Sequence, residues 1–209
     1  MESKTNNTEV PSQLTYFGNN KAKEFFSMLF PNINESKQFI EIRIINTEGK
    51  VEQCFFNDIN EAIKYIDKEW ETLKKQNVYF GVCPRSCKKG DKSSVSIIYC
   101  LWVDIDFKDI SQKEADKLLS DFSPYPNVVV SSGHGYHVYW IINPFDIESV
   151  ENVNYAEGIL KGIAQELHGD IGSAEIARVL RVPGTFNNKD IDNPKKVDII
   201  KYYEDDSDI

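Results

Sequence analysis

The chain has 209 residues, of which 41% are hydrophobic and 12% aromatic, enough for one large domain with a buried core or two small lobes. The net charge of −9 argues against a protein that coats nucleic acid without specificity. No apolar run reaches membrane-spanning length and the first residues do not resemble a signal peptide, so we expect a cytoplasmic protein with no membrane partner.

The first part of the chain reads as a loose arm followed by an αβ unit. Residues 1–20 are polar and turn-rich, and residues 21–76 form the N-terminal part of a single predicted domain, 21–203. Apolar residues at helical spacing predict a helix over 20–30, which Pro31 ends. Two β-rich runs, 38–46 and 50–56, are joined by Glu48-Gly49 as a hairpin. Asp58 and Glu61 form a capping pattern that opens a helix to Leu73.

The second part, 77–203, alternates strand and helix signals and predicts an α/β (α+β) fold with a mainly antiparallel sheet covered by helices. We expect strands at 77–83, 94–107, 127–131, 136–142 and 197–203. Helices are expected from the capping pattern Ser111/Glu114 to Phe122, over about 148–168, and over a short stretch from Ser173 to Leu180. Residues 204–209 form an acidic tail.

Cysteines are few and scattered, at Cys54, Cys83, Cys87 and Cys100, which does not suit a disulfide scaffold in a chain of this size. Cys83 and Cys87 have the spacing of half a zinc site, but no second Cys/His pair has matching spacing. Reduced thiols in a cytoplasmic protein are the better interpretation.

Two acids stand inside an apolar strand pattern in Leu-Trp-Val-Asp-Ile-Asp-Phe, residues 101–107. Because side chains alternate along a strand, Asp104 and Asp106 share one face, about 7 Å apart, while their neighbours point toward the core. Two adjacent carboxylates raise each other's pKa, and a divalent cation resolves that conflict. Paired oxygens suit Mg²⁺ or Mn²⁺ better than zinc. A strand end with two hydrated acids is the simpler alternative.

A Ser-Ser-Gly-His-Gly-Tyr-His sequence follows at residues 131–137. Two glycines in a turn allow a ligand to approach the backbone closely and meet its N–H groups. Ser131, Ser132 and His137 are therefore candidates for binding phosphate oxygens, with His137 fixed at the start of a strand. An ordinary glycine hairpin with a surface histidine is the alternative.

A third segment, residues 178–189, is rich in basic and amide side chains around a Pro-Gly turn. Arg178 and Arg181 share a face if they lie on a helical turn. Thr185, Asn187 and Lys189 alternate along an extended stretch, so they share one side. Such groups suit a triphosphate or a nucleic-acid strand, whereas a surface salt-bridged through Glu175 and Asp190 is the alternative.

The remaining candidates are a third acid and a basic loop. Asp170, between Gly169 and Gly172, reads as a third acidic ligand or as a helix cap, and Asp198 is its rival. The stretch from Lys74 to Lys92 carries six basic residues against one acid, and such a loop either contacts a phosphate backbone or is simply solvated. The acidic pair, the Ser/Gly/His turn and the Arg/Lys turn of residues 178–189 together match the requirements of two-metal nucleotidyl transfer.

Three motifs, taken in their order along the chain, resemble those of the archaeo-eukaryotic primase superfamily, in its primase-polymerase branch. The acidic pair Asp104/Asp106, the Ser131–His137 turn and the single acid Asp170 are similar to that family's three motifs, and Arg-Val-Pro-Gly-Thr-x-Asn-x-Lys resembles its plasmid and phage members. The resemblance covers about residues 77–203. It does not distinguish plasmid, phage or CRISPR-associated contexts.

The resemblance implies a two-lobed core, an N-terminal αβ unit packed on a lobe resembling an RNA-recognition module. It implies a DNA primase, a DNA polymerase or both, acting on NTP or dNTP substrates with a DNA template and primer. By the resemblance, Asp104, Asp106 and Asp170 bind two Mn²⁺ or Mg²⁺ ions and are catalytic. The nucleotide would meet Ser131 or Ser132, His137, Arg178, Arg181, Asn187 and Lys189.

Further implications concern nucleic acid and missing parts. Arg85 would meet the template, with Lys88 and Lys89 beside it as nucleic-acid contacts. Larger relatives carry a further domain after the catalytic core, so we expect an additional C-terminal domain or a partner protein. The zinc-binding insertion of many relatives is not recognisable in this sequence.

Two other functions remain open. A rolling-circle-type nicking endonuclease needs two histidines around one hydrophobic residue, but Gly135 and Tyr136 both separate His134 from His137. A non-catalytic single-stranded nucleic-acid-binding module would stack bases on Tyr136, Tyr139 or Trp140. That module would not explain the acidic pair.

Overall fold

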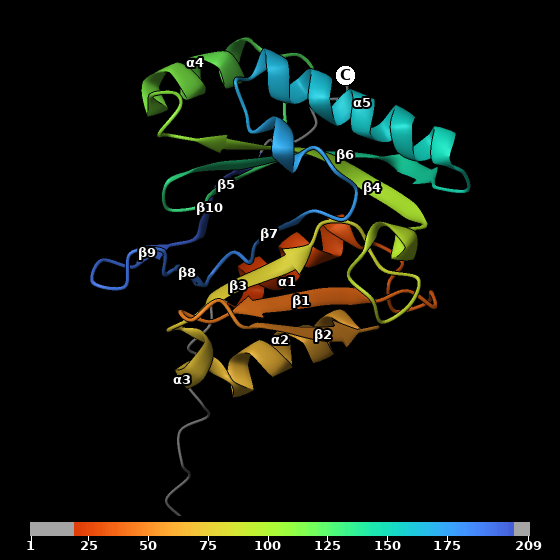
Figure 1. The fold of residues 1–209 in the computed structure, drawn as a ribbon, viewed down its shortest axis with the longest axis vertical. Helices are drawn as coiled ribbons and strands as arrows, with labels where there is room; N and C mark the ends of the chain where they lie inside the picture. Colours follow the sequence, from red (N-terminus) through yellow and green to blue (C-terminus); the bar gives the residue numbers. More distant parts are fainter. Residues whose placement is uncertain (1–18, 203–209) are drawn as a thin grey trace, which may run out of the picture.

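The computed structural model describes residues 19–202, which form two four-stranded sheets packed together with helices (Figure 1). Most of the predicted arm, residues 1–18, and the whole acidic tail lie outside the described residues. In Figure 1, α4 and α5 lie above the second sheet, the first sheet lies below it, and α2 and α3 lie at the bottom.

The first sheet has the order β2-β1-β3-β7, and every neighbouring pair is antiparallel. Its strands are β1 (Ile40–Ile45), β2 (Val51–Phe56), β3 (Asn77–Gly81) and β7 (Val179–Arg181). The helices of this lobe are α1 (Asn19–Leu29), α2 (Ile59–Lys68) and α3 (Trp70–Leu73). The predicted hairpin is confirmed, with Gly49 at φ 82° in its turn. The carboxylate of Asp58 accepts from the Glu61 backbone N–H, as the capping pattern predicts, and the expected long helix breaks at Glu69 into α2 and α3.

The second sheet has the order β10-β5-β6-β4 and is also antiparallel throughout. Its strands are β4 (Ile97–Asp106), β5 (Val128–Ser131), β6 (Gly135–Asp146) and β10 (Asp198–Tyr202), and its helices are α4 (Gln112–Asp121) and α5 (Val150–Glu166). Short elements complete the fold: η1 (Lys92–Ser94), η2 (Ile171–Ser173), β8 (Phe186–Asn187) and β9 (Lys195–Lys196). The predicted fold class, mixed α and β with antiparallel sheets, is confirmed.

The edge strand β4 separates two hydrophobic cores because its side chains alternate. Val103 and Ile105 pack with α4 and α5 on the outer face of the second sheet. Cys100 and Trp102 point the other way, into the larger core that lies between the two sheets. Asp104 and Asp106 continue this inner face, so the acids stand where the core between the sheets gives way to a pocket.

Aromatic rings from α1 join the two sheets. The fully buried ring of Phe25 lies edge-on to Phe80 of β3, with ring centroids 5.4 Å apart, and edge-on to Tyr139 of β6, at 5.3 Å. Edge-to-face pairs at this separation are favourable beyond the burial of their area. The two sheets are therefore held in one relative position by a shared core.

Two predictions about this architecture are wrong. The expected helical stretch from Ser173 to Leu180 is instead the short η2 turn followed by β7, because Leu180 pairs with Phe80 at the open edge of β3. The N-terminal part also does not end at residue 76. Its sheet also includes β3 and β7 from the later part of the chain, because β3 pairs with β1 and β7 pairs with β3.

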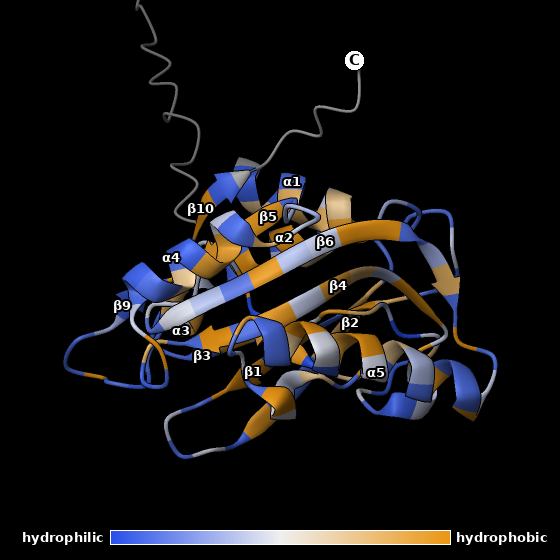
Figure 2. Cartoon of the chain, turned by 90° about the horizontal axis from the view of Figure 1, so that it is seen from above, coloured by the Kyte–Doolittle hydropathy of each residue, from blue (hydrophilic) through white to orange (hydrophobic). Residues whose placement is uncertain are grey.

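The surface helices are amphipathic. Figure 2 shows hydrophilic and hydrophobic segments alternating along α4 and α5, and their buried residues face the second sheet, as helical periodicity requires. Between residues 19 and 202, no helix has the length and apolar character needed to cross a bilayer.

Candidate active site

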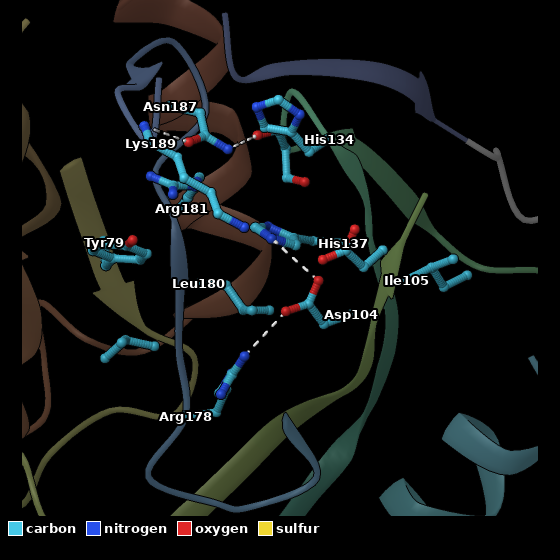
Figure 3. A pocket seen from close by; sticks show the side chains of 13 residues that line it. Tyr79, Asp104, Ile105, His134, His137, Arg178, Leu180, Arg181, Asn187 and Lys189 are labelled. Carbon is cyan, nitrogen blue, oxygen red and sulfur yellow. Dashed lines mark hydrogen bonds and ion pairs between the residues drawn. The ribbon is translucent and has the colours of Figure 1, made fainter. Parts of the chain in front are cut away.

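A pocket with a volume of about 180 Å³ lies between the two sheets (Figure 3). One wall, here called the acidic wall, comes from β4, β6 and the turn between β5 and β6, and contains Asp104, Asp106, Ser132, His134 and His137. The opposite wall, here called the basic wall, comes from β3, β7, β8 and the residues beside them, and contains Tyr79, Arg178, Arg181, Asn187 and Lys189. The structure therefore brings the acidic pair, the Ser/Gly/His turn and the basic segment 178–189 together around one pocket.

The strand register places the acidic pair as predicted. Asp104 lies opposite His137, and Asp106 lies opposite Gly135, across the β4–β6 ladder. Both acids line the pocket from the same face of β4, while Val103 and Ile105 are buried in the outer core. The alternative of a merely hydrated strand end does not describe Asp104, which is surrounded by partners.

One guanidinium bridges two of the candidate acids. Nη2 of Arg178 donates to Oδ2 of Asp104 at 3.0 Å and lies 3.7 Å from Oδ2 of Asp170. On its other side, Oδ1 of Asp104 lies 3.7 Å from Nε2 of His137. Arg178 therefore supplies the positive charge that makes two neighbouring carboxylates tolerable beside a core.

The second acid has a cation of its own. The backbone N–H of Lys108 donates to Oδ1 of Asp106 at 3.0 Å, and the ammonium donates to Oδ2 at 2.9 Å. Burial alone would raise the pKa of Asp106, but these hydrogen bonds and the charges of Lys108 and Lys189 outweigh it and lower the pKa. Asp106 is therefore held as a carboxylate.

The third acid lies directly beside the first. The backbone N–H of Asp170 donates to the carbonyl of Asp104 at 2.7 Å, and its side chain accepts from the Gly172 N–H at 2.8 Å, capping η2. Asp170 therefore caps η2, as one of its two predicted roles requires, and its carboxylate shares Arg178 with Asp104 without lining the pocket. The rival acid, Asp198 on β10, pairs with Lys196 and Lys21 and does not line the pocket.

Carboxylate oxygen is the donor type that Mg²⁺ and Mn²⁺ prefer, so the chemistry of the acidic wall fits these ions. Over residues 19–202, however, no three His, Cys, Asp or Glu side chains are already gathered closely enough to hold a metal ion. The oxygens of Asp104 and Asp170 face Arg178, and those of Asp106 face Lys108. A metal would therefore have to compete with these two cationic side chains.

The Ser/Gly/His turn is built as a tight loop. The Ser132 N–H donates to the Gly135 carbonyl at 2.9 Å, and Gly133 has a φ of 90°, a conformation that favours glycine. Ser132 lines the pocket, whereas Ser131 lies within the β5–β6 ladder and does not. Of the two candidate serines, the structure thus brings Ser132 to the site. His134, at the tip, also lines the pocket and was missed.

His137 is almost completely buried, with 4% of its surface exposed. Burial lowers the pKa of its imidazole to about 4, the charges of Arg181 and Arg178 add to this effect, and Asp104 opposes it. The side chain is therefore neutral near pH 7 and can donate one hydrogen bond to an oxygen at the pocket. This burial does not agree with the alternative of an ordinary glycine hairpin that carries a surface histidine.

Arg181 belongs to β7 and stacks on an aromatic ring. Its guanidinium lies 4.8 Å from the ring centroid of Tyr79, and Nη1 donates to Oδ1 of Asn77 at 2.6 Å. The expectation that Arg178 and Arg181 share a helical face is wrong, because β7 is a strand, but both still line the pocket. Tyr79 was not predicted, although alternation along β3 places it on the pocket side.

The segment after the Pro-Gly turn uses its polar groups unequally. Nδ2 of Asn187 donates to the Ser132 carbonyl at 2.8 Å, and its Oδ1 accepts from the Lys189 N–H, so this amide ties the two walls together. The fully buried hydroxyl of Thr185 donates to the Val182 carbonyl and does not line the pocket. Lys189 lines the pocket as expected.

The prediction that Arg85 meets the template is wrong. Its side chain is completely buried and paired with the equally buried Glu41, so it cannot reach a nucleic acid. Lys88 and Lys89 are exposed in the loop that follows, away from the pocket lining, and Lys88 lies over the ring of Phe39. This burial could not be predicted from local sequence, because Glu41 lies 44 positions away along the chain.

The aromatic residues considered for base stacking are not available at the surface. Tyr136, Tyr139 and Trp140 are all buried, with at most 4% of their surface exposed. Tyr136 and Trp140 pack in the outer core and Tyr139 in the core between the sheets. A binding module that stacks bases on these rings is therefore not supported.

Comparison with known proteins gives consistent results. Residues 88–204 match the family described as the RepB DNA-primase N-terminal domain. The chain is 28% identical over 204 residues to an uncharacterized protein of Methanocaldococcus jannaschii, covering 82% of this chain. It is 24% identical over 151 residues to a replication protein of Clostridium perfringens, covering 68% of this chain. The chain spans only 16% and 36% of the length of these two relatives.

Solved structures share the fold at low sequence identity. The AEP domain of the cyanophage S-2L primase-polymerase superposes with a TM-score of 0.60 and 14% identity, over 90% of this chain and 92% of that one. The primase RepB′ gives 0.57 and 16%, over 87% and 56%. Its catalytic domain in complex with initiator DNA gives 0.56 and 15%, over 87% and 85%.

Proposed function

Because this chain belongs to the family of the RepB DNA-primase N-terminal domain, we propose that it catalyses template-directed nucleotidyl transfer as a DNA primase, a DNA polymerase or both. The observation that carries this proposal is the pairing of an acidic wall, with Asp104 and Asp106, and a basic wall, with Arg178, Arg181 and Lys189, across one small pocket. Phosphoryl transfer needs both charge types close together, one for cations and one for phosphates.

In this proposal, Asp104 and Asp106 would hold divalent Mg²⁺ or Mn²⁺, with Asp170 as the nearest further acid. When bound, such ions neutralise charge on the triphosphate and activate the attacking hydroxyl. The carboxylate of Asp106 is ready for this role because its pKa is lowered. Lys108 and Arg178, which neutralise the acids in this structure, would then be free to face the phosphates.

The basic wall would bind the triphosphate of an NTP or dNTP. Arg178, Arg181 and Lys189 offer forked and single cationic donors, which suit phosphate oxygens. Neutral His137 and Ser132 would add hydrogen bonds from the acidic wall. The 3′ oxygen of a primer, or of a first nucleotide, would attack the α-phosphorus as its proton passes to water. The bond between the α-phosphorus and the bridging oxygen would break, and pyrophosphate would leave with that oxygen.

Asn187 would act differently from the expectation. Both ends of its amide are engaged within the protein, so its role in the proposal is to hold the Ser132 turn against Lys189. Lys88 and Lys89, which are exposed in the loop after Arg85, would contact the nucleic acid outside the pocket. The RepB′ catalytic domain, which shares this fold, has been solved with initiator DNA.

A primer-extension assay with Mn²⁺ and dNTPs tests the proposal. We expect the wild-type chain to extend a labelled primer, and the Asp104→Asn, Asp106→Asn double variant to lose activity on the order of 1,000-fold, equivalent to several kcal/mol of transition-state stabilisation. Asp198→Asn is the matched control, because this strand acid lies outside the pocket. Extension that survives in the double variant would contradict the proposal.

A further inference from the structure

The position of Arg178 depends on a short segment without regular structure. Residues 174–178, here called the bridging segment, connect η2 to β7. Within it, the Arg178 N–H donates to the Glu175 carbonyl at 2.9 Å, and the Arg178 carbonyl accepts from Val82 at 3.0 Å. Neither bond fixes the residue just before Arg178. Other contacts must determine where this backbone, and therefore the guanidinium, lies.

Arg85 makes such a contact from inside the protein. Its Nη2 donates to the Ala177 carbonyl at 3.0 Å, while Nε and Nη2 both contact Oε2 of Glu41, at 2.9 and 2.8 Å. Both charged side chains are completely buried. A buried ion pair of this kind gains little net stability over an apolar pair of the same volume. Its hydrogen bond to the bridging segment indicates a further role.

The fit around Arg85 is close. A Cβ placed on Gly81 would lie 2.8 Å from Nη2 and 3.1 Å from Cζ of Arg85, so the guanidinium lies directly against the glycine backbone. The last residue of β3 therefore has to be small for the Arg85 guanidinium to reach the Ala177 carbonyl. Arg43 also pairs with Glu41, at Oε1, but it donates to Gly90 and does not touch the bridging segment.

A second buried carboxylate holds the bridging segment from the opposite lobe. Oε1 of Glu157, on α5, accepts from the Ile176 N–H at 3.2 Å and pairs with Lys92 at 2.7 Å. Consecutive residues, Ile176 and Ala177, are thus fixed by one side chain from each lobe. Arg178 follows immediately and places its guanidinium between Asp104 and Asp170.

We propose that Arg85 is a positioning residue for Arg178: by fixing the Ala177 carbonyl, it sets the Arg178 guanidinium within reach of Asp104, Asp170 and the triphosphate. This inference rests on the proposed function, because it gives Arg178 a part in phosphoryl transfer. Arg85 itself touches no substrate. Its effect passes through the backbone of one residue.

A double-mutant cycle tests this coupling. In primer extension, we expect Arg85→Gln to lower kcat/KM for the nucleotide about tenfold or more, since small misplacements of a binding group are costly. If Arg85 acts through Arg178, the Arg85→Gln, Arg178→Gln double variant is no slower than Arg178→Gln alone. Effects that multiply fully would overturn the proposal.

Two further variants keep the test informative if Arg85→Gln folds poorly. Gly81→Ala keeps both charged residues but displaces the Arg85 guanidinium. Its effect should therefore also disappear in the Arg178→Gln background. Arg43→Gln removes a partner of the same glutamate without touching the bridging segment, and we expect it to leave kcat/KM unchanged. An equal loss in Arg43→Gln would overturn the proposal, because the loss would then come from disturbing Glu41 and not from the bond to Ala177.

A nuclear magnetic resonance measurement separates this inference from the proposed function. The Nε–Hε signal of Arg178, assigned by its disappearance in Arg178→Gln, is recorded in the full chain without nucleotide. We expect the signal to shift in Arg85→Gln and Gly81→Ala and to stay in place in Arg43→Gln. If the signal shifts in these two variants while the wild-type chain extends no primer, the positioning is supported and the proposed function is rejected. An unchanged signal would reject the positioning itself.

Discussion

His137 combines burial with a place beside a carboxylate, and its protonation has a consequence for stability. Because the folded pKa of about 4 lies below the ordinary 6.5, the unfolded chain binds the proton more readily. The stability that comes from a neutral His137 is therefore complete above pH 6.5 and is lost as the pH falls toward 4. The loss is on the order of 3 kcal/mol at most.

Urea denaturation between pH 7.5 and 4.5, without divalent ions, measures this effect. We expect the free energy of unfolding of the wild-type chain to fall more steeply below pH 6.5 than that of His137→Gln, which keeps a neutral polar side chain. The carboxylates contribute equally to both proteins, so the difference isolates the imidazole. Parallel curves for the two proteins would mean that His137 is protonated equally easily in both states.

At the residue level, the sequence predicts what depends on local alternation. Asp104 and Asp106 share a face because the strand period is two, and this needs no tertiary information. Arg85 shows the limit of such reasoning. A basic residue in a polar loop sequence reads as exposed, but it is paired with Glu41, 44 positions away, through a contact that only the fold creates. Tyr79 was missed for the same reason, since nothing local marks the pocket side of β3.

Among the secondary-structure elements, the β4–β6 pair is sensitive to one atom. A Cβ on Gly135 would collide with the backbone carbonyl of Ile105 in the neighbouring strand, between the two acids. We expect Gly135→Ala to destabilise the fold by about 1–3 kcal/mol, as overpacking against a backbone does. Thermal and urea unfolding of the variant measure the change.

The matched control lies on α5. Nothing lies within 4 Å of a Cβ at Gly158, in the middle of the helix. Because glycine costs helical stability, we expect Gly158→Ala to stabilise the chain by about 0.5–1 kcal/mol. If Gly135→Ala stabilised the chain as well, the contact with the Ile105 carbonyl would not be what requires glycine at position 135.

At this scale, elements with caps or long periodic patterns were predicted, and short ones were not. Ser111 caps α4 by accepting from Glu114, as its pattern predicts. The strand β7 has only three residues and forms because β3 offers an open edge. Its sequence carries no strand signal of its own. The pairing of distant segments, rather than local propensity, decides its conformation.

For the whole molecule, charge is distributed unevenly. The net charge is −9, yet the pocket's basic wall and the loop with Lys88 and Lys89 are cationic. If these two exposed lysines contact a single-stranded template, replacing both with alanine should reduce the slope of log K against log salt by about 1.4. Fluorescence anisotropy with a labelled oligonucleotide at several salt concentrations measures the slope.

The control removes the same charge elsewhere. Lys64 and Lys68 are exposed on α2, at the outer side of the first sheet, so their double alanine variant should keep the wild-type slope. A lower slope in this control as well would indicate that overall charge matters. In that case the loop would not be a specific contact.

The strand order β2-β1-β3-β7 has a consequence for how the protein is made. Tyr79 is translated long before its partner Arg181, and β3 keeps an unpaired edge until β7 emerges from the ribosome. At about 5–20 residues per second, a delay of roughly 100 residues lasts on the order of 10 s. During this interval the edge of β3 that later pairs with β7, in the basic wall of the pocket, stays unpaired. We expect chaperones that shield open sheet edges to bind the nascent chain at this stage of synthesis.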